Sequence, residues 1–131
     1  MTPPVVATSG VELELGRLRR LRQSLADAGC DAGLFYDPIN VRYATGTSNM
    51  QVYSLHNPCR YVFVPVVGDV VLFEFKGCEH LSVGHPCVGE VRTATSWYDF
   101  ITGSRTAEFA RRWATEIVAL LGADGRDLAV D

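Results

Sequence analysis

The sequence predicts an α/β domain in which a mixed β-sheet is flanked by helices. A leucine-spaced helical segment precedes a short apolar run, two β-rich runs follow each other across a turn, and a second amphipathic segment leads into a last apolar run. Helices that alternate with strands are typical of layered α/β folds. A chain of 131 residues with 47% hydrophobic side chains is large enough for one domain with its own core.

The first helix is predicted over residues 12–28. Before it, residues 1–10 are expected to be a flexible lead-in, because prolines and small polar side chains offer little to pack. The leucines at helical spacing are Leu15, Leu18, Leu21 and Leu25. Gly29 stands where a left-handed helix cap would form. The domain is therefore expected to occupy residues 11–131.

Three apolar runs predict strands in the first half of the sheet. Residues 32–36 are too few for a helix and end at Asp37-Pro38, which suits a buried strand followed by a turn. Residues 60–66 and 70–75 are β-rich and are separated by a short turn that contains glycine. We expect these two runs to be antiparallel neighbours.

The second half of the chain is expected to add a short strand, a helix and a last strand. A partly helical connection at residues 78–87 leads to the short strand around residues 88–91. The helix has a predicted apolar face made of Ala107, Ala110, Trp113, Ala114, Ile117, Val118 and Leu121. Residues 127–131 begin the last strand and no loop follows it, so we expect the chain to be cut from a longer protein.

Charge and hydropathy exclude two classes of partner. The net charge of −3 and the lack of a dense Lys/Arg stripe argue against a nucleic-acid-binding protein. The clustered cations are expected to form a solvated helix face and are Arg17, Arg19, Arg20 and Arg22. No apolar run approaches the roughly 20 residues of a membrane span, and the N-terminus lacks the features of a signal peptide. We therefore expect a cytoplasmic protein.

The segment 37–60 is predicted to be a long loop with functional content. Loops beyond about 12–15 residues are usually functional or disordered, and the aromatic and apolar residues here argue against disorder. The candidate binding residues are Asn49, Gln51, Tyr53, His56, Asn57 and Arg60. An ordinary surface loop of polar composition is one alternative. A stand-alone module that binds a small ligand is another.

Cysteine and histidine residues form one pattern whose residue types would suit zinc. The pattern C-x-H-x4-H-x-C comprises Cys78, His80, His85 and Cys87. Structural zinc sites commonly use spacings that aim two ligands at one ion, and this pattern lacks them. The four cysteines also include Cys30 and Cys59 and contain no CxxC pair, so we expect reduced and mostly buried thiols. The prediction is that no structural zinc binds.

The remaining motifs give no support for chemistry within this chain. Neither a G-x-S-x-G elbow nor a G-x-G-x-x-G or Walker motif occurs. The acidic residues are scattered at predicted strand ends and turns, where solvation or capping is expected: Asp31, Asp37, Asp69, Glu74, Glu79, Glu90 and Asp99. We therefore expect no catalytic residue and no metal ligand in this chain.

A signature within the segment DAGLFYDPINVRYATG links the chain to a known family. The pattern P-x-N-[IV]-x-Y-x-[TS]-G is present as Pro38, Asn40, Val41, Tyr43, Thr45 and Gly46. With the surrounding helices and hairpin, residues 12–131 resemble the amino-terminal domain of the creatinase, prolidase and aminopeptidase P family. The segment TSNMQVYSLHNPCRYVFV resembles the branch that contains dimethylsulfoniopropionate lyases and their relatives.

This resemblance implies a fold and a role. The fold implied is ribonuclease H-like, with a mixed sheet flanked by helices. The family's divalent metal pair, whether Mn, Zn, Co or Fe, is bound in a carboxyl-terminal "pita-bread" catalytic domain that this chain does not contain. The amino-terminal domain is implied to be non-catalytic, to support a homodimer and to close the partner subunit's substrate pocket.

The parent protein is accordingly expected to be a metal-dependent Xaa-Pro peptidase or creatinase-like hydrolase. A dimethylsulfoniopropionate lyase-like parent is the alternative. The expected partners are the chain's own catalytic domain, a second subunit and a small-molecule or peptide substrate. Within the resemblance, the loop candidates named above are implied to line the pocket or the dimer contact.

Overall fold

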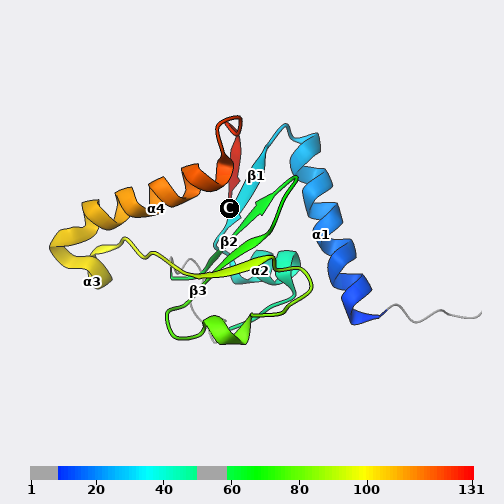
Figure 1. Ribbon diagram of the computed structural model, residues 1–131, viewed down its shortest axis with the longest axis horizontal. Helices are drawn as coiled ribbons and strands as arrows, with labels where there is room; N and C mark the ends of the chain where they lie inside the picture. The colour runs from blue at the N-terminus through cyan, green and yellow to red at the C-terminus, as the bar shows by residue number, and fades with distance from the viewer. Residues whose placement is uncertain (1–8, 50–58) are drawn as a thin grey trace, which may run out of the picture.

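The computed structural model describes residues 9–49 and 59–131, which form a mixed five-stranded sheet with helices on both sides (Figure 1). The strand order is β4-β3-β2-β1-β5. The elements are α1 (Gly10–Asp27), β1 (Ala32–Phe35), α2 (Pro38–Thr45), β2 (Tyr61–Pro65), β3 (Val71–Glu74), the 3-10 turn η2 (Glu79–Leu81), β4 (Glu90–Thr93), α3 (Asp99–Thr102), the 3-10 turn η3 (Gly103–Arg105), α4 (Thr106–Leu121) and β5 (Leu128–Val130). The predicted fold class is confirmed.

The helix α1 begins with a capping box. The Ser9 hydroxyl accepts a hydrogen bond from the Glu12 amide, and the Glu12 carboxylate accepts one from the Ser9 amide. Ser9 and Gly10 belong to the predicted lead-in but form this cap and the first turn; residues 1–8 lie outside the described residues. Gly29 has a φ of 75° just after the helix, so the predicted left-handed end is confirmed.

The arginine cluster on α1 is only partly a solvated face. Arg19 and Arg20 are exposed as predicted. Arg17 and Arg22 are half-buried, because the Arg17 guanidinium lies 6.0 Å from the centre of the Tyr43 ring and the Arg22 guanidinium donates to the Gly68 carbonyl. The expectation that all four are solvated is therefore wrong for these two side chains, which connect α1 to Tyr43 of α2 and to the hairpin turn at Gly68.

Both faces of the hairpin are covered, which explains its continuous apolar sequence. β2 and β3 are antiparallel, with Val62 opposite Leu72, as predicted. Val62 and Val64 belong to the core cluster shared with α1 and α2, whereas Tyr61 and Phe63 belong to the cluster beneath α4. Because successive strand residues point to opposite faces, a strand covered on both sides buries every side chain.

The edge strands are both parallel to their neighbours. β4 pairs with β3, and β5 pairs with β1 so that Ala32 lies opposite Leu128. The short strand predicted at residues 88–91 is confirmed but begins two residues later, at Glu90. The last predicted strand is also confirmed.

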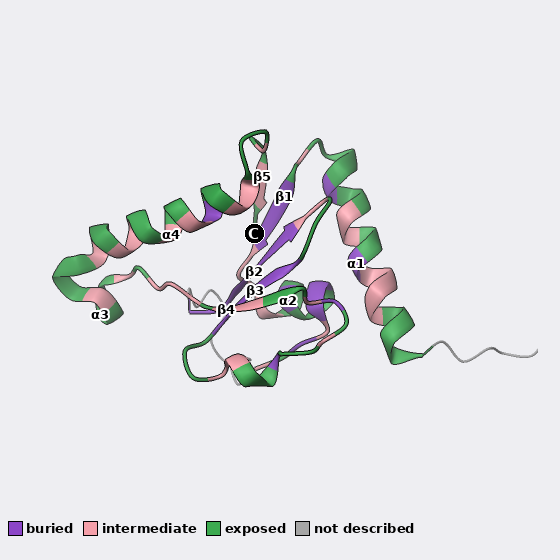
Figure 2. Ribbon diagram, viewed as in Figure 1, coloured by how far each residue is buried: buried purple, intermediate pink, exposed green. Residues whose placement is uncertain are grey.

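The apolar face predicted for the last helix is too wide. In α4 the side chains that reach the sheet are Trp113, Ile117, Leu120 and Leu121, and only Ile117 is fully buried. Val118 is 64% exposed, and Ala107 and Ala114 are exposed as well, so these three are corrections. The helix touches the sheet along one narrow stripe, and its outer surface is open to solvent (Figure 2).

Within residues 9–49 and 59–131, no helix combines the length and the apolar character needed to cross a membrane.

Candidate functional site

The signature segment is a helix, which corrects the predicted loop. Residues 38–45 form α2, with Pro38 in its first turn. The Asp37 carboxylate caps the helix by accepting from the Ile39 amide at 2.8 Å, and Gly46 ends it with a φ of 74°. An Asp-Pro start and a glycine eight residues on were visible start and stop signals. The helix was missed because eight residues are too few to show a helical period.

The end of the chain holds this helix in place. The Asp131 carboxylate accepts hydrogen bonds from the amides of Tyr36 and Asp37 at 2.8 and 3.0 Å, and from the Asn40 side chain at 2.9 Å. The signature asparagine therefore joins α2 to the residue that follows β5. Its role within the described chain is to position α2, because its amide donates to Asp131.

The signature glycine is favoured by its backbone conformation. Its φ of 74° is left-handed, a conformation that other residues rarely adopt. A Cβ atom at Gly46 would also lie 2.5 Å from the Glu14 carboxyl carbon, so the flexible Glu14 side chain would have to move. Among the signature residues, Val41 packs inward and joins the core cluster beneath α1, as does Ala44 between the signature positions, whereas Tyr43 is exposed. The signature thus encodes the packing of α2 against α1 and the sheet.

A buried carboxylate at the end of β3 forms the polar centre of the domain. Glu74 is fully buried, and its Oε1 accepts hydrogen bonds from Arg60 Nε at 2.8 Å, Asn49 Nδ2 at 2.7 Å and the Phe75 amide at 3.0 Å. Its Oε2 accepts from the Ser82 hydroxyl at 2.8 Å. The expectation that this residue is solvated or caps an element is therefore wrong.

The surroundings of Glu74 keep it ionised. Burial works to raise the pKa of Glu74, but hydrogen bonds from Arg60, Asn49 and Ser82 outweigh it, so the pKa lies below its usual value. Both carboxylate oxygens already accept hydrogen bonds from the protein. This group consequently serves as an anchor, and a strand glutamate inside the apolar run VVLFEF was the sequence signal for it.

The polar network extends from Glu74 to the end of α2. Arg60 is 2% exposed, and its Nη2 donates to the Thr47 hydroxyl at 2.8 Å. The Thr45 and Thr47 hydroxyls are 2.6 Å apart, and the Thr45 hydroxyl donates to the Val41 carbonyl. The network therefore joins the last turn of α2 to the start of β2 and the end of β3.

Two of the six candidate binding residues meet in this network. Asn49 and Arg60 both donate to Glu74 Oε1, so one carboxylate oxygen holds the residues on either side of positions 50–58. The other four candidates, Gln51, Tyr53, His56 and Asn57, lie outside the described residues. The expected contact of Arg60 with a partner subunit stays a prediction. In the described chain its guanidinium is buried and donates to Glu74 and Thr47.

The four residues of the C-x-H-x4-H-x-C pattern differ in their surroundings. Cys87 is buried, Cys78 is half-buried and His80 is exposed. His85 Nδ1 lies 3.7 Å from a Glu14 oxygen. Among the described residues, no three or more His, Cys, Asp or Glu side chains form a group that could hold a metal ion.

We expect the purified chain to contain no stoichiometric zinc, because the spacing of these four residues does not aim them at one point. Elemental analysis of protein purified without chelator tests this expectation. A chelator is also expected to leave the unfolding temperature unchanged. One zinc per chain, together with unfolding on chelation, would show that the expectation is wrong.

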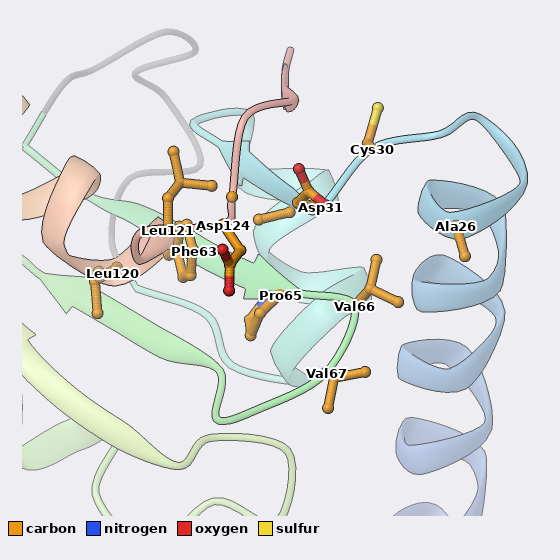
Figure 3. Close-up of a pocket in the computed structure, with 12 residues that line it drawn as sticks. Ala26, Cys30, Asp31, Phe63, Pro65, Val66, Val67, Leu120, Leu121 and Asp124 are labelled. Atoms are coloured by element: carbon orange, nitrogen blue, oxygen red, sulfur yellow. The ribbon is translucent and has the colours of Figure 1, made fainter.

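A cavity of about 360 Å³ lies between the C-terminal ends of α1 and α4 (Figure 3). Asp31 and Asp124 are its acidic lining residues. The Asp31 carboxylate accepts from the amides of Arg126 and Asp127, and these hydrogen bonds hold the pKa of Asp31 below its usual value. Asp31 therefore shapes the turn before β5. The free thiol of Cys30 and the Asp124 carboxylate also line the cavity.

Comparison with known families agrees with this architecture. A sequence model of the creatinase/prolidase N-terminal domain matches residues 17–130. The chain belongs to this family. The match begins inside α1 and ends in β5, so it contains the signature helix and the Glu74 network of this creatinase/prolidase N-terminal domain.

Curated relatives of this creatinase/prolidase N-terminal domain include two enzymes of the same name. Dimethylsulfoniopropionate lyase DddP of Roseovarius nubinhibens is 34% identical over 95% of this chain and 30% of its own length. The enzyme of the same name from Roseobacter denitrificans is 36% identical over 88% of this chain and 26% of its own length. The chain thus spans less than a third of these relatives.

Solved structures share the fold at lower identity. A proline dipeptidase from Streptococcus pneumoniae superposes with a TM-score of 0.57 at 17% identity, over 87% of this chain and 72% of that one. A dipeptidase from Pyrococcus horikoshii gives a TM-score of 0.56 at 22% identity, over 88% of this chain and 28% of that one. These similarities establish the fold of the creatinase/prolidase N-terminal domain.

Proposed function

We propose that this chain is the non-catalytic N-terminal domain of a metal-dependent enzyme of the creatinase fold. The observation that carries the proposal is the family match over residues 17–130 together with a span of 30% or less of the curated relatives. The described polar groups fit a structural role, because the carboxylate oxygens of Glu74 and Asp131 accept hydrogen bonds that stabilise the fold.

The parent enzyme is proposed to act on dimethylsulfoniopropionate or a related substrate. The relatives at 34% and 36% identity are both named as dimethylsulfoniopropionate lyases, which supports this class. An Xaa-Pro peptidase or creatinase-like hydrolase is the second candidate. It is favoured by the structural similarity to a proline dipeptidase and another dipeptidase, which rests on 17% and 22% identity.

The divalent metal pair of such an enzyme is proposed to be held by a carboxyl-terminal catalytic domain. The described residues of this chain do not form a site for the metal pair, because no three or more His, Cys, Asp or Glu side chains among them come together. No chemical step is therefore assigned to a residue of this domain.

The domain is further proposed to support a homodimer and to close the partner subunit's substrate pocket. Its candidate contacts are the polar residues between α2 and β2. The Glu74 network supports this role, since it fixes Asn49 and Arg60 to the same carboxylate oxygen. A closing element needs rigid supports if it is to position a substrate within fractions of an ångström.

The 131-residue chain alone is expected to show no peptidase, amidinohydrolase or lyase turnover. The parent protein is expected to show metal-stimulated turnover of one substrate class. The assay pairs dimethylsulfoniopropionate, an Xaa-Pro dipeptide and creatine with Mn, Zn and Fe for both proteins. Metal-stimulated turnover by the chain alone, with contaminating enzyme excluded by a mock purification, would overturn the proposal of a non-catalytic domain.

His56→Ala in the parent protein is expected to lower kcat/KM by about tenfold while metal content stays unchanged, because it removes a positioning group and no ligand. His80→Ala is the matched control, since His80 is exposed within η2. Kinetics that are identical in the two variants would remove His56 from the proposed pocket contact.

A further inference from the structure

A second cavity, which adjoins the Glu74 network at Phe75, has the chemistry of a ligand site. It has a volume of about 480 Å³ and lies between the end of β3, the segment that follows β4, and the helices α3 and α4. Pockets that bind small molecules usually measure about 300–1,000 Å³. The proposed function makes no use of this cavity.

Part of the cavity lining is apolar and open to water. Phe75, Ile101 and Phe109 line it, and the first two are 42% and 51% exposed. Phe100, the neighbour of Ile101, is 88% exposed. Covering such side chains with an apolar group removes apolar surface from water and favours binding.

Two basic side chains also give the cavity lining positive charge. Lys76 and Arg112 line the cavity, and none of its described lining residues is acidic. The Arg112 guanidinium lies 4.6 Å from the centre of the Phe109 ring, which places the charge beside one of the apolar lining residues. The hydroxyl-bearing residues Thr95 and Ser96 add polar groups to the same lining.

Two carboxylates on neighbouring elements already accept hydrogen bonds from within the chain. Arg112 donates to Glu108 Oε1 at 3.0 Å, but Arg105 donates to both oxygens of Glu108, at 2.8 and 2.6 Å. Glu79 accepts from the Thr93 hydroxyl and the Gly77 amide. Glu108 is therefore shared by two arginines, and the described lining of the cavity contains two cations and no carboxylate, in a chain whose net charge is −3.

We infer that this cavity binds a small organic carboxylate with an apolar or aromatic body. The carboxylate meets Lys76 and Arg112, and the body covers Phe75, Ile101 and Phe109. A planar guanidinium pairs with a carboxylate through two parallel hydrogen bonds between opposite charges. A neutral amide of the same shape lacks the negative charge and is expected to bind more weakly. A cationic ligand of the same shape is repelled by the two basic side chains.

The test is an NMR titration of the isotope-labelled 131-residue chain with phenylacetate, phenylacetamide and phenethylamine. These probes share a ring and differ in charge. Phenylacetate is expected to give saturable shifts at residues 75–76 and 93–96 and to bind about tenfold more tightly than the amine. Equal binding of all three probes, or shifts that lie elsewhere, would overturn the inference.

Charge reversal on α4 supplies the matched comparison. Arg112→Glu is expected to weaken phenylacetate binding by about tenfold, whereas Arg111→Glu, at the exposed neighbouring position outside the lining, leaves it unchanged. Lys76→Glu serves as a second variant if Arg112→Glu alters thermal unfolding. Equal losses in the Arg111 and Arg112 variants would mean that only overall charge matters, and the site would be withdrawn.

Discussion

Val64→Asp is expected to abolish soluble folding of this chain. Val64 is completely buried in β2, opposite Gly33 of β1, within the core cluster beneath α1 and α2. An ionised carboxylate placed there has no partner, and its desolvation costs several kcal/mol, roughly the size of the whole stability of a domain at about 5–15 kcal/mol. Soluble yield and thermal unfolding measured by circular dichroism give the result.

Val67→Asp is the matched control for that experiment. Val67 lies in the turn of the same hairpin and is 88% exposed, so the same change in side chain removes no core packing. Its unfolding temperature is expected to stay within a few degrees of the parent value. If Val64→Asp were as stable as Val67→Asp, the assignment of β2 as a strand buried on both faces would be wrong.

Glu74→Leu and Arg60→Met are each expected to lower the free energy of unfolding by about 3–5 kcal/mol. Each single change leaves the opposite charge buried without its partner, since the Arg60 and Glu74 side chains are 3% and 0% exposed. The double variant is expected to recover part of the loss, because no lone charge remains. Urea unfolding of the four proteins forms a double-mutant cycle.

The exposed pair Arg92–Glu90 provides the comparison for this cycle. Its N···O distance is 2.7 Å, nearly the same as in the buried pair, but its side chains are 33% and 49% exposed. Glu90→Leu is therefore expected to cost less than about 1 kcal/mol. Similar losses at Glu74 and Glu90 would show that burial does not set the strength of the Glu74 network.

The stability contributed by Glu74 also depends on pH. Its pKa is lowered in the folded chain, so its contribution is complete above the ordinary value of 4.5 and is lost as pH falls below it. The difference in unfolding free energy between the parent chain and Glu74→Leu is expected to shrink between neutral and acidic pH. A difference that does not change with pH would contradict an ionised Glu74.

The sequence by itself determined the elements with a strong local pattern. The leucine spacing and Gly29 defined α1, and the two β-rich runs around a short turn defined the antiparallel hairpin. These features depend on neighbours a few residues apart, where helical and strand periods are visible. The family signature could likewise be recognised in the sequence, because all its residues lie within one short segment.

Tertiary structure alone decided what the polar residues do. In the sequence Glu74 is one of several scattered acidic residues, and only the pairing of β2 with β3 brings it to Arg60. Asn40 meets its partner Asp131 only because β5 places that residue beside α2. Likewise, only packing against the sheet left Val118 of α4 outside the core. Such contacts join residues far apart in the chain, and no local period encodes which distant side chain will arrive.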